Sequence, residues 1–266
     1  MKRAFSLVEL SIVLVILGLL VGGILAGKSL ISAAELRAVT TEYTRYITAS
    51  HTFRDKYFAL PGDMANATAV WGKDDTNCTG HTGSNATPGT CNGDGDGQIT
   101  SAAGVSATGE MFRFWQQLSL AGLIEGTYSG LSGPTLYMSY PGADVVPGTN
   151  TPASKFGKGG WAMLYLPVPA GDSSTYARNY KNMFTIGMRR ANFLPLDALF
   201  KPEDAWNIDK KIDDGVPGTG KVMARDYTGW GFATSCTNST SQTDYTATYK
   251  TDHATIACTL MFPDAF

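Results

Sequence analysis

The sequence lacks the motifs that mark the common enzyme classes. Its 266 residues contain no Gly-x-Ser-x-Gly nucleophile turn, no phosphate-binding loop, no dinucleotide-binding glycine fingerprint and no His-Glu-x-x-His zinc helix. The three histidines, His51, His81 and His253, are far apart in the sequence. We therefore expect a protein that is not an enzyme.

Basic runs are also absent. The chain has 21 Lys and Arg residues against 23 Asp and Glu residues, and no basic run is longer than Arg189-Arg190 or Lys210-Lys211. Because nucleic-acid binding needs clustered cations that neutralise phosphates, we expect no specific nucleic-acid partner. Charged residues make up only 17% of the chain, whereas Gly occurs 30 times, which is typical of a turn-rich, largely β domain.

Cysteine is scarce and occurs in two local pairs, Cys78 with Cys91 and Cys236 with Cys258. An even number of cysteines in an exported chain favours two disulfides. Four cysteines allow three connectivities, of which we favour the local one, and four reduced thiols are the alternative. Without a Cys-x-x-Cys motif or closely spaced histidines, a zinc site is not expected.

The longest charge-free run, Leu10 to Gly27, has 18 residues. As a helix it rises about 27 Å, close to the hydrocarbon thickness of a bilayer. A secretory signal peptide is one interpretation, and Ile31-Ser32-Ala33 imitates its cleavage site, but Glu9 at membrane depth would cost about 2.5–3.5 kcal/mol. An ordinary membrane anchor is a second interpretation, although the helical pattern continues past Lys28.

A third interpretation comes from the residues around this run. A basic leader, Met1-Lys2-Arg3-Ala4, precedes Phe5, the run Ser6-Leu7-Val8-Glu9-Leu10 and the long apolar helix. This segment resembles the class III signal of type IV prepilins and type II secretion pseudopilins, except that the family usually has Gly where this chain has Ala4. The resemblance implies cleavage between Ala4 and Phe5 by a prepilin peptidase, with N-methylation of the new Phe5 amine.

Glu9 carries the assembly hypothesis. A carboxylate buried in an apolar filament core is strongly unfavourable unless it meets a cation. The resemblance implies that this cation is the Phe5 amine of a neighbouring subunit, so that Glu9 would set the axial register of a homopolymer. The alternative is an interfacial carboxylate that faces water. The glycines between Gly18 and Gly27 permit either close helix packing or local melting of the helix.

The pattern divides the chain into a leader and three structural parts. We expect a leader at residues 1–4, a transmembrane and filament-core helix at 5–27, an amphipathic helical half at 28–60 and a globular head at 61–266. After Lys28, apolar residues recur at spacings of three and four, which is typical of a helix with one buried face. The helix should end near Phe58, before a Pro-Gly pair.

The head is expected to be α+β, with a mainly antiparallel sheet on which the N-terminal helix packs, as in pilins. The pattern predicts helices at 110–124 and 202–214. It predicts strands at 136–140, 161–166, 183–188 and 255–262.

Residues 92–99, Asn-Gly-Asp-Gly-Asp-Gly-Gln-Ile, match the first two-thirds of an EF-hand calcium loop. The candidate Ca²⁺ ligands are Asn92, Asp94, Asp96 and Gln98. The twelfth position is Ala103, which offers no carboxylate. The carboxylates that would have to complete the shell are Glu110, Asp74 or Asp75. The alternative is a Gly/Asp turn that satisfies only its own backbone.

A second acidic group, Asp209, Asp213 and Asp214, lies at the end of the helix predicted at 202–214. These carboxylates could bind a cation. The other interpretation, which we favour, is a solvated polar helix end.

Taken together, these features favour a structural filament subunit. The precursor would lie in the inner membrane of a bacterium with a two-membrane envelope, and a prepilin peptidase and inner-membrane assembly machinery would act on it. The product would be a helical homopolymer, either a surface filament or a periplasmic pseudopilus, that serves adhesion, motility or secretion. The sequence leaves open whether it is a major pilin, a minor pilin or a pseudopilin. A membrane-anchored calcium-binding or adhesive module that never polymerises is the alternative.

Overall fold

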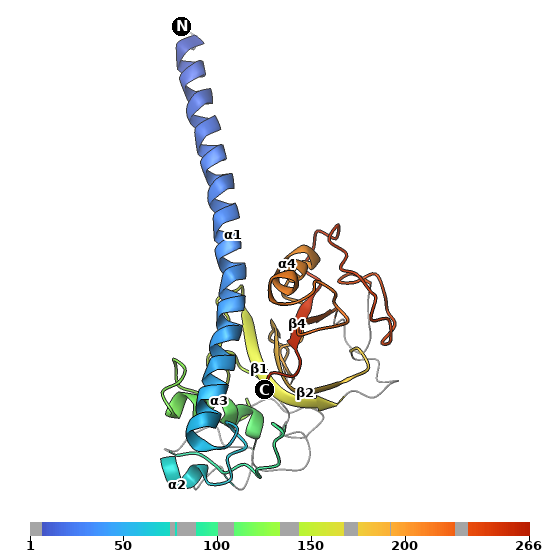
Figure 1. Cartoon of the computed structure of the whole chain (residues 1–266). Helices are drawn as coiled ribbons and strands as arrows, with labels where there is room; N and C mark the ends of the chain where they lie inside the picture. The colour runs from blue at the N-terminus through green and yellow to red at the C-terminus, as the bar shows by residue number, and fades with distance from the viewer. Residues whose placement is uncertain are drawn as a thin grey trace.

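The computed structural model describes residues 7–74, 78, 89–100, 109–133, 144–167, 175–191, 193–226 and 234–266. Its dominant feature is helix α1, Leu7–Tyr57, whose 51 residues rise about 77 Å. The first half of α1 projects beyond the head and the second half packs against it (Figure 1). The fold is α+β, as predicted, because the head carries a four-stranded antiparallel sheet.

The sheet has the strand order β1-β2-β4-β3, and each neighbouring pair is antiparallel. Its strands are β1 Gly159–Pro167, β2 Asn179–Met188, β3 Met223–Arg225 and β4 Thr259–Phe262. The long β1–β2 hairpin pairs Gly159 with Met188, and the short β4 pairs Phe262 with Phe184 of β2. Phe184 and Phe262 therefore lie side by side in the middle of the sheet.

Two of the predicted strands, 161–166 and 183–188, fall within β1 and β2. The strand predicted at 255–262 is shorter than expected, because residues before Thr259 pair only through a single bridge between Cys258 and Phe200. Strand β3 was not predicted, since its three residues are too few to show an alternating pattern. The strand predicted at 136–140 lies outside the described residues.

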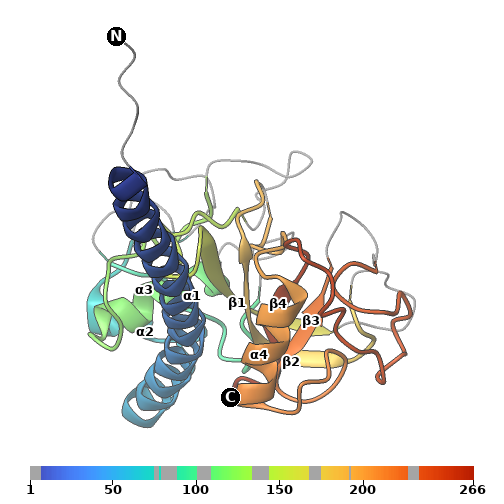
Figure 2. The ribbon, with the colours of Figure 1, turned by 90° about the horizontal axis from the view of Figure 1, so that it is seen from above.

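Three shorter helices complete the described part of the head: α2 Ala67–Trp71, α3 Glu110–Leu120 and α4 Pro202–Ile212. Helix α3 ends earlier than predicted because Gly122, with φ 72°, turns the chain and lets Leu123 N donate to Leu118 O. Helix α4 begins with Pro202, as predicted from its fixed φ. Seen from above, the sheet and α4 lie to one side of α1, with α2 and α3 on the other (Figure 2).

The core is built on aromatic rings contributed by several elements. Tyr46 of α1 contacts Trp115 of α3 at 5.0 Å and Trp161 of β1 at 5.5 Å between ring centroids, in edge-to-face geometry. Phe184 also packs against Trp115. Because these rings come from α1, α3 and two strands, they fix the C-terminal half of α1 to the head.

Both disulfides have the local connectivity favoured from the sequence: Cys78 bonds to Cys91, and Cys236 bonds to Cys258. The second disulfide ties a segment that precedes β4 to Cys258, the residue directly before that strand. The first joins two residues of the stretch that connects α2 to the acidic loop at 92–99.

Candidate functional site

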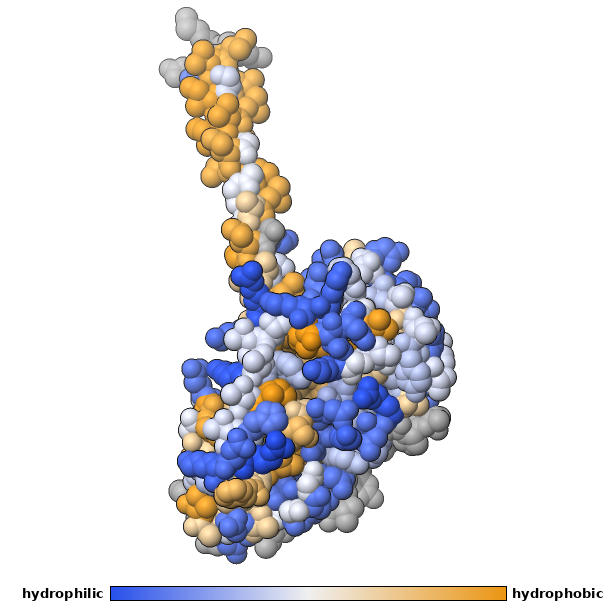
Figure 3. All heavy atoms as spheres, viewed as in Figure 1, coloured by the Kyte–Doolittle hydropathy of each residue, from blue (hydrophilic) through white to orange (hydrophobic). Residues whose placement is uncertain are grey.

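The N-terminal half of α1 is an uncovered apolar rod. Its large apolar side chains between Leu7 and Ile31 are 50–84% exposed. The helix is long and apolar enough to cross a membrane, by length and composition. Figure 3 shows the rod as a mostly hydrophobic surface, interrupted by paler patches, above a mainly polar head. Because a soluble monomer rarely leaves so large an apolar surface in water, a bilayer or another protein is expected to cover it.

Glu9 lies in the first turn of α1, and its side chain is exposed. Ala4 and Phe5 lie outside the described residues. Cleavage before Phe5 and the pairing of Glu9 with a Phe5 amine therefore stay predictions. The helix runs without a break through Gly18 and Gly27, and a Cβ added at either glycine would meet nothing within 4 Å.

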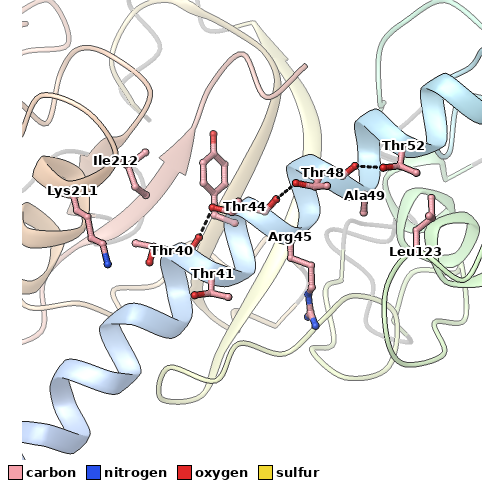
Figure 4. Close-up of a pocket in the computed structure, with 11 residues that line it drawn as sticks. Thr40, Thr41, Thr44, Arg45, Thr48, Ala49, Thr52, Leu123, Lys211 and Ile212 are labelled. Carbon is pink, nitrogen blue, oxygen red and sulfur yellow. Dashed lines mark hydrogen bonds between the residues drawn. The ribbon is translucent and has the colours of Figure 1, made fainter.

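A groove of about 760 Å³ runs along the outer face of α1 where the helix crosses the head. Its floor carries threonines at every fourth position from Thr40 to Thr52, and its walls are Leu123 after α3 and Ile212 of α4 (Figure 4). Lys211 of α4 and Arg45 of α1 add positive charge to it. The groove lies below the apolar rod on the same helix.

The threonines make this groove less polar than their composition suggests. The hydroxyl of Thr44 donates to Thr40 O at 2.9 Å, and those of Thr48 and Thr52 donate to the carbonyls four residues earlier at 2.8 Å. Because each hydroxyl is satisfied by the helix backbone, the methyl groups are left to face the groove. The result is a ridge of small side chains that a second helix could approach closely.

On its opposite face α1 carries a buried carboxylate, Glu42, that sequence analysis missed. Its side chain is 4% exposed. One oxygen accepts from Lys155 N, and the other accepts from Ser154 Oγ and from Trp161 Nε1, all at 2.8 Å. These bonds fix the position of the head along α1.

The acidic loop at 92–99 gathers three carboxylates. The ligand oxygens of Asp63, Asp94 and Asp96 lie within 4.8 Å of one another. Asp63 is 3% exposed, and its two oxygens accept from Gly95 N at 2.6 Å and Gly97 N at 2.9 Å. The pKa of Asp63 is raised to about 6, chiefly by burial; the two N–H donors oppose the rise, and the neighbouring carboxylates add to it.

The other predicted ligands of this loop have different surroundings. Asn92 Oδ1 accepts from Thr68 N at 2.8 Å, and Gln98 N donates to Asp96 Oδ1 at 2.7 Å. Whether their side chains ligate a cation stays a prediction. Asp74 is buried against Arg113, 3.5 Å away. Ala103 and Asp75 lie outside the described residues.

Glu110, at the start of α3, closes the loop without joining the three carboxylates. Its Oε1 accepts from Asp94 N at 3.2 Å, and its Oε2 accepts from Thr100 N at 2.9 Å and Thr100 Oγ1 at 2.6 Å. Burial raises the pKa of Glu110. Carboxylate oxygens are the ligands that Ca²⁺ prefers, so the group of Asp63, Asp94 and Asp96 could hold such an ion.

A second carboxylate group lies at the end of α4, where Asp209, Asp213 and Asp214 have ligand oxygens within 4.8 Å of one another. Asp209 is fully buried and accepts from Tyr249 OH at 2.8 Å and from Gly215 N at 3.2 Å. Burial raises the pKa of Asp209 to about 7. This group too could bind a cation such as Ca²⁺.

No family model, no curated protein and no solved structure matches the chain. The architecture itself is pilin-like, because a long apolar N-terminal helix packs through its second half on an antiparallel sheet.

Proposed function

We propose that this protein is a prepilin-like structural subunit that polymerises through α1 into a helical filament. The observation that carries the proposal is the apolar rod from Leu7 to Ile31, which is exposed in the single chain and continuous with a helix that is packed firmly on a head. A rod of this kind can lie in a bilayer before assembly and in a filament core afterwards. No catalytic role is part of the proposal.

The threonine groove of α1 supports a helix-on-helix mode of assembly. It offers a ridge of methyl groups from Thr40 to Thr52, about 18 Å long, beside two apolar walls. Gly18 and Gly22 lie on one side of the rod and Gly23 and Gly27 on another, and a Cβ at any of them would meet open space. Small residues on both surfaces would let the rod of one subunit pack closely in the groove of another. The groove would then cover part of the apolar rod.

Processing and location follow from the residues that precede the rod. In this proposal a prepilin peptidase cleaves between Ala4 and Phe5 in the inner membrane of a bacterium with two membranes. Assembly machinery in that membrane then adds the subunit to a surface filament or a periplasmic pseudopilus. Glu9 accepts the Phe5 amine of a neighbouring subunit, so that only the correct axial stagger leaves no uncompensated charge. The filament serves adhesion, motility or secretion.

Calcium would stabilise the head of such a subunit. The three carboxylates Asp63, Asp94 and Asp96 repel one another when all are charged, and a divalent cation would remove that repulsion. The same group favours a second candidate function, a membrane-anchored calcium-binding or adhesive module that uses α1 only as an anchor. The two functions differ in whether the mature chain polymerises.

The test is intact-mass analysis and N-terminal sequencing of protein from sheared surface filaments of its native host. We expect a chain that starts at N-methyl-Phe5 and carries two disulfides. A chain that starts at Met1, or near Ala34, would overturn the filament proposal. A processed chain that remains only in membranes would favour the anchored module.

A further inference from the structure

Phe58, the residue that follows α1, combines two unfavourable features. Its side chain is 92% exposed, and its φ is 55°. A helix commonly ends on a residue with such a left-handed backbone, but that residue is usually Gly, since a bulky side chain is disfavoured there. Neither feature stabilises the isolated chain. The exposed ring therefore indicates a contact with another molecule.

A cavity of about 310 Å³ opens near the opposite end of the head. Its lining includes Glu35 of α1 and Asp204 of α4. In Figure 1, α4 lies at the end of the head from which the apolar rod projects, whereas α1 ends beside α2 at the other end. Phe58 and this head cavity therefore lie toward opposite ends of one subunit.

The head cavity offers apolar surface without net charge. Phe156 and Leu199 line it, and Met188 and Ile256 expose 37% and 56% of their surface there. The charged residues of the lining are two lysines and two carboxylates, whose formal charges cancel: Lys158, Lys201, Glu35 and Asp204. The volume is at the lower end of the range for ligand pockets, about 300–1,000 Å³, which suits a single large side chain. An uncharged apolar group is therefore the expected occupant.

The length of α1 relates Phe58 to the head cavity of a second copy. Phe58 follows Glu35 by 23 residues, which is about 35 Å of helix rise. A parallel copy displaced by this distance along α1 brings its Phe58 to the level of the first copy's head cavity. The same displacement sets the threonines from Thr40 to Thr52 beside residues 17–29 of the first copy.

That range contains all the glycines of the rod, from Gly18 to Gly27. One axial displacement thus places the exposed ring at a cavity and the threonine groove at the glycines of the rod. Pairing of Glu9 with a Phe5 amine needs a displacement of only four residues, or about 6 Å. It would join a different pair of neighbours, since a subunit in a helical filament contacts several others.

We propose that Phe58 of one subunit inserts into the head cavity of another copy displaced by about 35 Å, where it packs on Met188 and Ile256. The inference rests on the proposed function and adds a contact between heads to the contact between helices. Because the two surfaces are different and lie toward opposite ends of the head, the contact is heterologous and repeats along a filament without closing.

The first test compares variants of the full chain in the native host by the yield of sheared filaments. Phe58→Gly removes the ring and suits a φ of 55°, so the folding equilibrium constant of the subunit should be unchanged or higher in urea unfolding. Filament yield should nevertheless fall at least about tenfold, because an apolar side chain is no longer buried at each contact. Phe58→Leu, the matched control, keeps a large apolar side chain and should retain most of the yield.

A normal yield from Phe58→Gly would overturn this inference and leave the proposed function standing. An unsubstituted chain that forms no filaments would overturn both.

The second test is cross-linking of filaments by a short bis-maleimide. Asp55→Cys and Lys158→Cys are combined, because both positions are exposed and the ring and the apolar lining stay in place. Asp55 lies about 30 Å along α1 from Glu35, so the reagent can join the two cysteines only between chains. We expect a ladder of multimers, and none when Thr246→Cys, also exposed, takes the place of Lys158→Cys. Dimers alone would indicate a two-fold contact, and monomers alone would place Phe58 elsewhere; either result would overturn the inference.

Discussion

The indole N–H of Trp161 on β1 donates a hydrogen bond of 2.8 Å to the carboxylate of Glu42 on α1. The same carboxylate also accepts from the hydroxyl of Ser154 and the backbone N–H of Lys155. All three donors are neutral, and the carboxylate is 4% exposed. One acidic side chain therefore joins the helix to the edge of the sheet.

The Glu42 contact makes a prediction about stability. We expect Glu42→Ala to lower the free energy of unfolding by about 3 kcal/mol or more, because it leaves the buried donors of Trp161 and Ser154 without an acceptor. Urea unfolding of the full chain in detergent measures this. Glu35→Ala, on an exposed part of the same helix, is the control and should change it by about 0.5 kcal/mol or less. Equal losses in both variants would contradict a special role for Glu42.

Glu9 tests the assembly proposal. We expect Glu9→Ala to leave the head folded, with an unchanged unfolding midpoint, and to reduce the yield of sheared filaments at least about tenfold, because a register pair of about 1.4 kcal/mol or more would be lost at each interface. Quantification of subunit in sheared and membrane fractions measures this. Glu35→Ala should assemble normally. Filaments at the normal yield from Glu9→Ala would remove the register role.

The threonine groove gives an independent prediction for assembly. Thr48→Trp fills the groove with a large ring, and we expect it to block filament formation because a second helix can no longer approach the ridge. Since Thr48 is exposed, the stability of the isolated subunit should change by about 0.5 kcal/mol or less. Thr246→Trp, at an exposed position in the C-terminal part of the head, is the size-matched control. Electron microscopy of both variants decides, and normal filaments from Thr48→Trp would exclude the groove as an assembly surface.

Calcium should stabilise the head through Asp63, Asp94 and Asp96. We expect Ca²⁺ at a hundredfold excess over its dissociation constant to add about 2.7 kcal/mol to the free energy of unfolding at pH 7, relative to chelator. Asp63→Asn should abolish this gain. Asp214→Asn should keep it, which separates the loop from the second carboxylate group. Retention of the full gain by Asp63→Asn would show that the cation binds elsewhere.

Asp209 predicts a pH dependence in chelator. Its pKa is raised from 3.8 to about 7 by burial, so between pH 4 and 7 the folded protein holds a proton that the unfolded chain has released. Stability from this group therefore falls as pH rises through that window. We expect Asp209→Asn to flatten the fall in unfolding free energy between pH 4 and 7, whereas exposed Asp252→Asn should not. An unchanged slope in the Asp209 variant would assign the pH dependence to other groups.

Much of the α1 packing could be predicted from the sequence, because its buried face follows spacings of three and four. The positions that face the core are Val39, Glu42, Tyr46, Ala49 and Phe53. Glu42 is the charged residue within this stripe, and its position there was the available signal that buried donors hold its carboxylate. The donors themselves could not be predicted, since Ser154 and Trp161 lie 112 and 119 residues further along the chain.

The acidic loop shows the same limit. Asp94 and Asp96 stand in a local pattern that indicates cation binding. Asp63 belongs to the turn after α1, and it reaches the loop only because Gly93 packs against its backbone, where a Cβ would overlap it. Strand β3 could not be predicted for the same reason. Met223 to Arg225 form a strand because they pair with β4, which is distant in the sequence, so no local pattern indicates the pairing.

The position of Glu42 has a mechanical consequence. A pull along α1 reaches the head through the ring contacts of Tyr46 and through the three hydrogen bonds of one carboxylate. Since those bonds end on the first residues of β1 and the loop before it, tensile load enters the sheet at one edge and is carried in shear along the β1–β2 ladder. A fibre made from such subunits would stretch by tilting heads before its strands separate.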